Sequence, residues 1–483
     1  MPDERIHAPD LTGAVEWFNV PGPLSLRQLR GKVVLLDFWT YGCVNCMHIL
    51  PDLKRLEQKY GDALVVVGVH SAKFTNERKS DNIRHIIVRY EIEHPVANDA
   101  NFAIWREYGA RAWPTMVLID PEGYVVATAS GEGKTEAFDE AIAAVIAFFE
   151  EQGKIDRTPL AMSPEGAKLK TSTLAFPGKV LADEASSRLF IADSNHNRIL
   201  EADFNGNVRR VLGDGEFFRP QGMALDDERG NLLYVADTEQ HRVCSIDLDS
   251  GVVRRIAGTG EQGAWGGIGG AARETALSSP WDLSRDGKLL FIAMAGTHQV
   301  WLLDLERSLS LAYAGSGREA RVDGGAEEAA FAQPSGHALG DEHTLYVADA
   351  ESNIIRAISL PPVNTVKTLA GGDLFEFGDK DGKGDAVRLQ HPLGVAWMNG
   401  RLYIADTYNH RIKMMTPGDA KVTSFAGTGE SGHVDGPAKR ARFYEPGGVS
   451  ATSKTLFVAD TNNHAIRTIR LADGVVETLN VRL

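Results

Sequence analysis

Cysteine is scarce in this chain, whose 483 residues contain only Cys43, Cys46 and Cys244. A small secreted domain held together by disulfides needs more of them, so that class of protein is excluded. The count is typical of a protein that works in a reducing compartment. Two of the three cysteines are separated by only two positions, which makes them the first candidates for chemistry.

Long apolar runs are also missing. The longest, residues 33–36, 64–69 and 141–149, are far shorter than the roughly 20 apolar residues of a membrane-spanning helix. The N-terminal stretch contains no apolar segment of the kind found in secretory signal peptides. We therefore expect a cytoplasmic protein with no membrane partner.

The chain has no excess of basic residues. Residues 1–155 contain 16 Lys and Arg against 22 Asp and Glu, and the remainder contains 35 against 43. These two parts therefore carry −6 and −8 of the total charge of −14. Proteins that bind nucleic acids usually present surplus positive charge. We expect no nucleic acid partner, and a basic face assembled by the fold stays an open alternative.

Length and periodicity predict more than one domain. A chain of 483 residues exceeds the usual size of a single hydrophobic core. Over residues 1–152, strands alternate with helices, which indicates an α/β layer around a central sheet. The expected strands are 33–38, 64–70, 95–97, 115–120 and 124–129, and the expected helices are 43–59, 77–90, 101–108 and 135–151.

The cysteine pair lies where a buried strand meets a helix. The apolar run 33–36 continues into Asp37, and after a turn at Gly42 the helix begins at Cys43-Val44-Asn45-Cys46. Two cysteines with this spacing can close a small disulfide, and the backbone N–H groups of a helix N-terminus favour an anion. The stretch therefore predicts redox chemistry.

Two segments resemble the thioredoxin superfamily. Phe38-Trp39, followed by Cys43, Cys46 and Pro51, is similar to its active-site strand and helix. Well downstream, residues 108–115 are similar to the segment that holds its cis-proline. Extra strand and helix material at 70–108 brings the sequence nearest to the TlpA-like branch of the superfamily.

This resemblance implies a role for each residue of the site. Cys43 is expected to be the exposed nucleophile that forms a mixed disulfide with substrate, and Cys46 the buried thiol that resolves it. Asp37 is expected to be a buried acid with a raised pKa that takes the proton of Cys46. Pro114, in cis, would face the disulfide.

The resemblance also implies substrate contacts from Trp39, Trp113 and Thr115, with the backbone of Trp113 offering a strand-like edge. Simple core packing is an equal alternative for the two tryptophans, and His48 is interpreted as a surface residue. The implied activity is thiol–disulfide exchange with a protein substrate, without a metal or a cofactor.

Other interpretations of the cysteine pair are weaker. A zinc site would need a second cysteine pair, and haem attachment would need His where Met47 stands. Thr40 and Cys43 resemble the Thr-x-x-Cys of peroxiredoxins, but Leu36 replaces the proline of that family. Peroxidase activity therefore remains a secondary alternative. Val44-Asn45 differs from the Gly-Pro of reducing thioredoxins, which leaves the direction of electron flow open.

After a segment 153–172 that has two prolines and is interpreted as a linker, the chain repeats. Each repeat has a short apolar strand that usually ends in Ala-Asp, a polar turn, and a second strand often opened by His-Arg. The anchor positions are Asp193, Asp237, Met294, Asp349, Asp406 and Asp460, and the first interval is shorter than the other four. Four strands in each of six repeats predict a six-bladed β-propeller over 173–483 that resembles the NHL repeat family.

Recurrence favours an architectural role for the polar residues of the repeat. An Asp found at one register in successive blades is expected to bind backbone N–H groups and fix a turn. We expect the propeller to be a platform for a protein partner. The alternative is a redox-sensing or non-catalytic scaffold. How the ring closes, and whether residues 171–176 add an outer strand, is left open.

Overall fold

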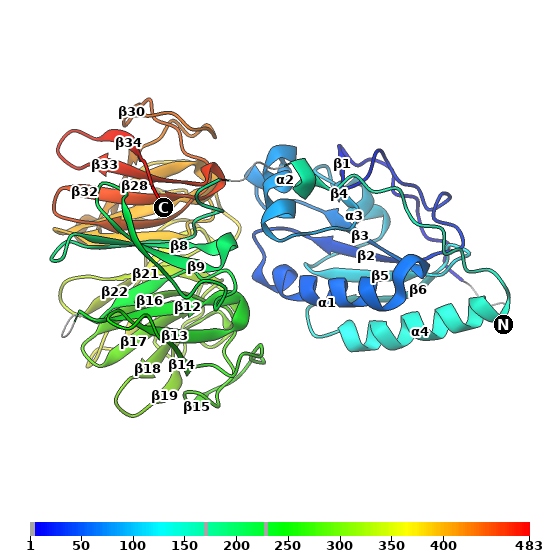
Figure 1. Ribbon diagram of the computed structural model, residues 1–483, viewed down its shortest axis with the longest axis horizontal. Coiled ribbons are helices and arrows are strands. Elements are labelled where there is room, and N and C mark those ends of the chain that lie inside the picture. The colour runs from blue at the N-terminus through cyan, green and yellow to red at the C-terminus, as the bar shows by residue number, and fades with distance from the viewer. Residues whose placement is uncertain (1–4, 169–171, 227–229) are drawn as a thin grey trace. The chain divides into compact units, whose positions relative to one another are not determined.

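The chain forms two compact units, Met1–Lys170 and Thr171–Leu483. A computed structural model describes residues 5–168, 172–226 and 230–483. The first unit is an α/β layer and the second is an all-β propeller (Figure 1). The predicted fold class is therefore confirmed.

A mixed sheet of six strands, in the order β1-β4-β3-β2-β5-β6, forms the centre of the first unit. Strands β2, β3 and β4 are parallel, and the other neighbours are antiparallel. The strands are β1 (Trp17–Phe18), β2 (Val33–Trp39), β3 (Leu64–His70), β4 (Val96–Asn98), β5 (Thr115–Ile119) and β6 (Val125–Ser130).

Helices cover both faces of this sheet. They are α1 (Val44–Tyr60), α2 (Ser80–Arg89), α3 (Ala103–Glu107) and α4 (Thr135–Glu151). Helices α1 and α4 lie along one face (Figure 1), where Leu53 and Ile142 pack with Leu35. Since residues of a strand alternate between faces, Asp37 lies on the side of α1. No helix in the described ranges is long and apolar enough to span a membrane.

The observed elements lie close to the predicted ones, with two differences. The predicted helix 77–90 is divided into a short turn, η2 (Asn76–Arg78), and α2, because Lys79 between them has an extended backbone. The two-residue strand β1 was not predicted, since so short a segment has no periodic pattern.

Residues 153–168 pack on the first unit. Lys32 Nζ donates to the carbonyl oxygens of Asp156 and Thr158 at 3.0 and 2.7 Å. Further on, the turn η3 (Glu165–Lys168) begins where the Glu165 N–H donates to Asn19 Oδ1 at 2.9 Å. Residues 169–171, near the end of the expected linker, lie outside the described ranges.

Six antiparallel sheets form the blades of the second unit (Figure 1). Blade one contains β7 (Val180–Asp183), β8 (Arg188–Asp193), β9 (Arg198–Asp203) and β10 (Val208–Leu212). Blade two contains β11 (Met223–Leu225), β12 (Leu232–Asp237), β13 (Arg242–Asp247) and β14 (Val253–Ala257). Blade three contains β16 (Pro280–Asp286), β17 (Leu289–Met294), β18 (Gln299–Asp304) and β19 (Leu309–Ala314), with β15 (Gly269–Ala271) outside β19.

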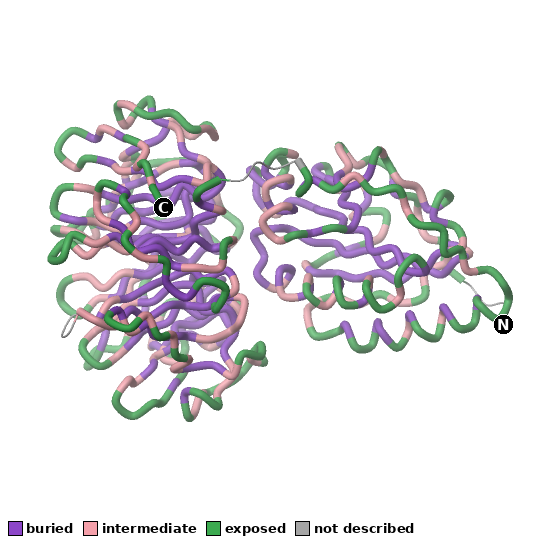
Figure 2. The backbone as a smooth tube through the Cα atoms, viewed as in Figure 1, coloured by how far each residue is buried: buried purple, intermediate pink, exposed green. Residues whose placement is uncertain are grey.

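The remaining blades repeat the five-stranded pattern of blade three. Blade four contains β21 (Pro334–Leu339), β22 (Thr344–Asp349), β23 (Ile354–Ser359), β24 (Thr365–Ala370) and an outer β20 (Gly324–Gly325). Blade five contains β26 (Gly394–Met398), β27 (Arg401–Asp406), β28 (Arg411–Thr416), β29 (Lys421–Ala426) and β25 (Gly382–Lys383). Blade six contains β31 (Pro446–Ala451), β32 (Thr455–Asp460), β33 (Ala465–Arg470), β34 (Val475–Leu479) and β30 (Gly436–Pro437). The inner strands are the buried part of each blade (Figure 2).

The recurring polar residues hold the blades together. In five blades, the anchor Asp accepts a backbone N–H from the segment that enters the same blade, as Asp193 does from Ala175 at 2.7 Å. In blade three, the N–H of Ser278 donates to the sulfur of Met294 instead. At the fourth position after each anchor, a His or Asn accepts an N–H from the next blade. The repeat pattern did not reveal this link between blades.

The two ends of the propeller meet at blade one. The N–H of Phe176 donates to His464 Nδ1 at 3.1 Å, which joins blade six to blade one. At the periphery, the N–H of Val208 in β10 donates to the Arg482 carbonyl oxygen at 2.9 Å. Residue 171 lies outside the described ranges, and residues 172–176 form no strand. Contacts of blade six and of the residues that follow it with blade one therefore close the ring.

A buried lysine joins the inner strands of several blades. Lys179, just before β7, donates to Asp282 of blade three at 3.0 Å and to the carbonyl oxygens of Ser335 and Leu393 at 3.0 and 2.6 Å. Both members of the Lys179–Asp282 pair are buried. The glycines of the Pro-x-Gly elements let the strands approach here, since a Cβ on Gly448 would lie 2.8 Å from the Cα of Lys179.

Replacing Lys179 with methionine is expected to lower the free energy of unfolding of the propeller by about 3 kcal/mol, because Asp282 would remain buried without its cation. Urea denaturation followed by hydrogen exchange of propeller peptides measures this change. The control is Lys288→Met, whose ion pair with Glu306 is exposed on both sides and should change stability by less than about 1 kcal/mol. Equal effects of the two substitutions would contradict the assigned role.

Candidate active site

The two cysteines lie at the start of α1. Cys43 is the N-cap residue of this helix, and the N–H of Cys46 donates to the Cys43 carbonyl oxygen at 3.1 Å. Both are free thiols. Cys43 keeps 7% of its surface exposed and Cys46 none. Burial, followed by a hydrogen bond with Cys43, raises the pKa of the Cys46 thiol well above its usual value. Cys43 is therefore buried and not exposed as expected, because the turn before α1 packs around it, and it is the one of the two thiols that keeps accessible surface.

Asp37 lies beneath the cysteines on the same side of the sheet as α1. Its side chain is fully buried, and neither carboxyl oxygen has a hydrogen-bond partner in the described part of the chain. Burial raises the pKa of Asp37 to about 7, against a smaller opposite effect of His94. A negative charge on Asp37 in turn raises the pKa of Cys46. The carboxyl can therefore exchange a proton near neutral pH.

The segment that contains Pro114 borders the end of β2. Phe38 and Thr115 are paired across β2 and β5, so Pro114 lies beside the residues that lead into the cysteine turn. The peptide bond between Trp113 and Pro114 is cis. The Pro114 carbonyl oxygen accepts the N–H of Gly131 at 2.8 Å.

The two neighbours of Pro114 differ in exposure. Trp113 is half-buried, and its Nε1–H donates to the Ser71 carbonyl oxygen at 2.9 Å, which fixes the indole. Thr115 is buried, with its hydroxyl bonded to the Ala112 carbonyl oxygen at 2.7 Å and to Ser130 Oγ at 2.8 Å. Of these two neighbours, Trp113 is therefore the one that offers side-chain surface.

Trp39 is a core residue in this structure. It is 1% exposed and packs edge-on against His70, with ring centroids 4.9 Å apart. His70 stacks on Tyr41 from the turn, and burial lowers the pKa of His70 to about 3, so the ring is neutral. The alternatives for Trp39 are core packing and substrate contact, and these surroundings agree with core packing.

A buried glutamate holds the turn that precedes Cys43. Glu77 accepts the hydroxyl of Thr40 at 2.7 Å, the N–H of Gly42 at 2.8 Å and the N–H of Phe74 at 2.8 Å. Burial raises the pKa of Glu77, and these hydrogen bonds oppose that effect. Sequence reasoning missed this residue, since nothing in the pattern around Glu77 connects it to the distant turn at Thr40.

His48 is not the surface residue that the sequence suggested. Only 4% of its side chain is exposed, and Nδ1 lies 2.8 Å from Glu132 Oε2. Glu132 follows Gly131, whose N–H binds the Pro114 carbonyl oxygen. This pair therefore connects the active-site helix to the loop that supports the cis-proline. The expectation failed because the partner lies 84 residues away in sequence.

Comparison with known proteins agrees with this geometry. A thioredoxin-like family model matches residues 31–125, and an NHL repeat model matches residues 389–413. Fold and site together define a thioredoxin-like domain joined to an NHL β-propeller. Over 117 residues, or 24% of the chain and 65% of the relative, the sequence is 29% identical to thiol-disulfide oxidoreductase ResA of Bacillus thuringiensis.

Several relatives match almost the whole chain. NHL repeat-containing protein 2 of Gallus gallus is 41% identical over 527 residues, which cover 99% of this chain and 72% of that protein. Protein SUPPRESSOR OF QUENCHING 1, chloroplastic, of Arabidopsis thaliana is 44% identical over 496 residues, 96% of this chain and 47% of that protein. The chain belongs to the NHL repeat-containing protein 2 family. It spans about half the length of the plant relative.

Proposed function

We propose that this protein is a thiol–disulfide oxidoreductase that acts through Cys43 and Cys46, with its propeller as the platform for a protein partner. The observation that carries the proposal is a buried carboxyl without hydrogen-bond partners among the described residues, Asp37, beneath a buried thiol and a reachable one. A buried acid with a pKa near 7 has little structural value, and a proton transfer is the function that it fits.

The exchange proceeds in two steps. The Cys43 thiolate, at the N-terminus of α1, attacks one sulfur of a substrate disulfide, and the other substrate sulfur leaves as a thiolate and takes a proton. Asp37 then accepts the proton of Cys46, whose sulfur attacks Cys43. The mixed disulfide breaks, the second substrate thiol is released, and two electrons have passed from the dithiol to the substrate. In the opposite direction the same steps oxidise a substrate dithiol.

The substrate class follows from the surroundings of the cysteines. The backbone at Trp113 and Pro114, next to the end of β2, offers an edge along which an extended peptide can lie, and the half-buried Trp113 adds an aromatic contact. β-Propellers generally mediate protein interactions. A protein disulfide or dithiol is therefore the expected substrate.

Cys46→Ser tests the proposal. Without the resolving thiol, the variant is expected to accumulate mixed disulfides with specific proteins through Cys43, visible as bands that disappear on reduction. The double variant Cys43→Ser, Cys46→Ser is the control and should trap none. If the single variant also traps none, the alternative of a scaffold without exchange activity is favoured. Peroxidase activity is less well supported, because the Thr40 hydroxyl is buried and binds Glu77.

A further inference from the structure

Blade two lacks the outer strand that the later blades have. Blades three to six each contain a fifth strand outside the fourth, and in blade one Arg482 pairs beside β10. The sheet of blade two ends at β14, and no strand in the described ranges pairs with its outer side. The cause is visible in the sequence, since the interval from Asp193 to Asp237 is the shortest between successive anchors.

The missing strand leaves backbone groups of blade two without a neighbouring strand. In blade three, β15 pairs with Leu309, Ser310 and Leu311 of β19. Leu311 lies opposite Leu302 of β18, and the corresponding pair in blade two is Arg254 and Ser245. The open positions are therefore 252–254. A strand edge of this kind can accept another strand through main-chain hydrogen bonds.

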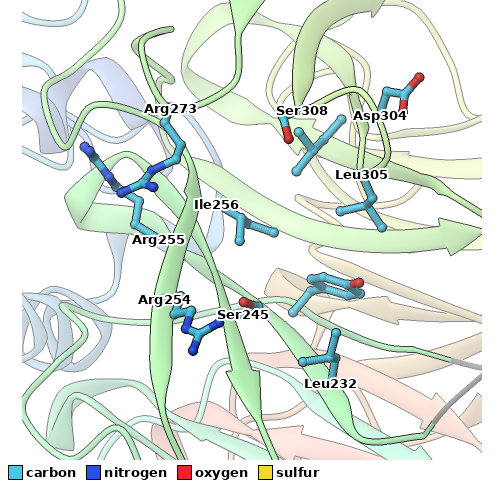
Figure 3. Close-up of a pocket in the computed structure, with 11 residues that line it drawn as sticks. Leu232, Ser245, Arg254, Arg255, Ile256, Arg273, Asp304, Leu305 and Ser308 are labelled. Carbon is cyan, nitrogen blue, oxygen red and sulfur yellow. The ribbon is translucent and has the colours of Figure 1, made fainter.

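A pocket of about 490 Å³ lies beside this edge, between blades two and three (Figure 3). Its lining includes apolar side chains and three arginines: Leu232, Ile256, Leu305, Arg254, Arg255 and Arg273. Arg255 and Arg273 lie on one side of it in the view of Figure 3, with Arg254 further along β14. The pocket thus combines apolar surface with three guanidinium groups.

The carboxylate of the lining does not neutralise these arginines. Asp304 lies on the far side of the pocket in Figure 3 and accepts the N–H groups of Glu306 and Arg307 at 3.0 and 2.8 Å. Arg255 donates to the neutral carbonyl oxygen of Thr259 at 2.5 Å. None of the three arginines has an ion-pair partner within the described ranges.

Blade one offers a direct comparison. There Arg210 lies opposite Glu201 across β9 and β10 and forms an ion pair with it. At the same place in blade two, Arg254 lies opposite Ser245, which lines the pocket. Blade two therefore keeps the cation and lacks the carboxylate directly opposite it, while the charge of Asp247, the last residue of β13, interacts with Arg254 without forming an ion pair.

We infer that β14 and the pocket bind an extended, acidic segment of a partner protein, which adds to blade two as its fifth strand. Main-chain bonds to the open edge hold the segment, and acidic side chains at every second position, on the face toward the pocket, meet the arginines that line it. A second copy of this chain is a poor occupant, because edge-to-edge pairing would bring arginines against arginines.

The docking site rests on the proposed function only for the propeller's role as the platform for a protein partner. It adds where on the propeller that partner binds and that the bound segment is extended and acidic. No step of it involves the cysteines. The Cys43→Ser variant therefore separates the docking site from the proposed catalytic activity. It should lose thiol–disulfide exchange and still bind the partner segment at β14.

The test uses the full chain and a short fluorescein-labelled peptide in which glutamate and valine alternate. Fluorescence anisotropy should show saturable binding that weakens as salt is added. Reversing two charges, Arg254→Glu with Arg273→Glu, should weaken binding by about tenfold or more. The matched control, Arg209→Glu with Arg440→Glu, reverses two exposed arginines of blades one and six that do not line the pocket, and should bind as the parent does.

Two further probes separate strand addition from charge attraction. A peptide with proline in place of two valines keeps its charge but cannot form the ladder, so it should bind weakly. Hydrogen exchange should slow in β14 when the alternating peptide is bound. The inference would be overturned if the proline peptide or a lysine–valine peptide bound as tightly as the alternating peptide, or if the double variant of Arg254 and Arg273 bound as tightly as the parent. Hydrogen exchange in β14 that does not change when the alternating peptide is bound would also overturn it.

Discussion

The Cys43→Ser variant is expected to reduce protein disulfides no faster than the background reaction. The chain has no thiol that can replace Cys43. Cys46 is fully buried with a raised pKa, and Cys244 lies within blade two, where burial raises its pKa to about 12. Because their pKa values are raised, both thiols remain protonated at neutral pH, and a protonated thiol does not attack a disulfide. Insulin reduction, followed by turbidity, measures the loss.

Cys244→Ser is the matched control for this experiment. It removes a thiol of the same chain without touching the site, so its rate should equal that of the parent protein. Cys244 is 1% exposed and lies in the interior of blade two. Equal insulin reduction by the parent and by Cys43→Ser would show that the dithiol does not carry the activity, and would leave the scaffold alternative.

The fold was predictable because its signals are local. The strand predicted at 64–70 is β3, Leu64–His70, and the helix predicted at 43–59 is α1, Val44–Tyr60. The buried strands are runs of Val and Leu, and the helices carry one apolar face, so a window of about 15 residues contains the information. The propeller followed from repetition alone, since six copies of one pattern need a closed ring to bury their faces.

The supporting contacts of the site were not predictable, because each joins residues that are distant in sequence. Glu77 holds the turn at Thr40 and Gly42, and His48 meets Glu132 across 84 residues. The buried ion pair of the propeller, between Lys179 and Asp282, is of the same kind. A polar residue that looks like surface in a local window can be buried by a partner that the window does not contain.

The open edge of β14 is an intermediate case. The short interval between Asp193 and Asp237 is visible in the sequence, but its meaning depends on where the extra residues of the other blades go. Only the sheets show that those residues form the outer strands. A departure from a repeat thus becomes informative once the structure of the regular copies is known.

Asp37→Asn is expected to stabilise the thioredoxin-like unit at pH 8 and to leave its stability unchanged near pH 3. The folded pKa of Asp37, about 7, is raised above the value of 3.8 that it has when exposed. Unfolding between these values releases a proton, so the stability of the parent falls as pH rises from about 4 to 7 and then levels off. The difference of about 3 pH units corresponds to roughly 4 kcal/mol at pH 8.

Asp37→Asn should also slow thiol–disulfide exchange, because the asparagine amide cannot accept the proton of Cys46. Resolution of the mixed disulfide is expected to fall by about a hundredfold near pH 7, the usual contribution of a general base, and to recover partly at higher pH. A stability gain together with a loss of rate is typical of a functional buried charge, since a merely structural residue would lose both.

Asp139, a carboxylate whose pKa is lowered in the folded protein and not raised, provides the control. Ion pairing with Lys59 lowers the pKa of Asp139, so this charge stabilises the folded state above its usual pKa. Asp139→Asn should therefore lower stability at pH 8, where Asp37→Asn raises it. Urea unfolding at several pH values, followed by hydrogen exchange in β2 and α1, distinguishes the two. A change for Asp37→Asn that is the same at pH 3 and pH 8 would show that the carboxyl does not titrate in the folded protein, and the proton transfer to Asp37 would have to be abandoned.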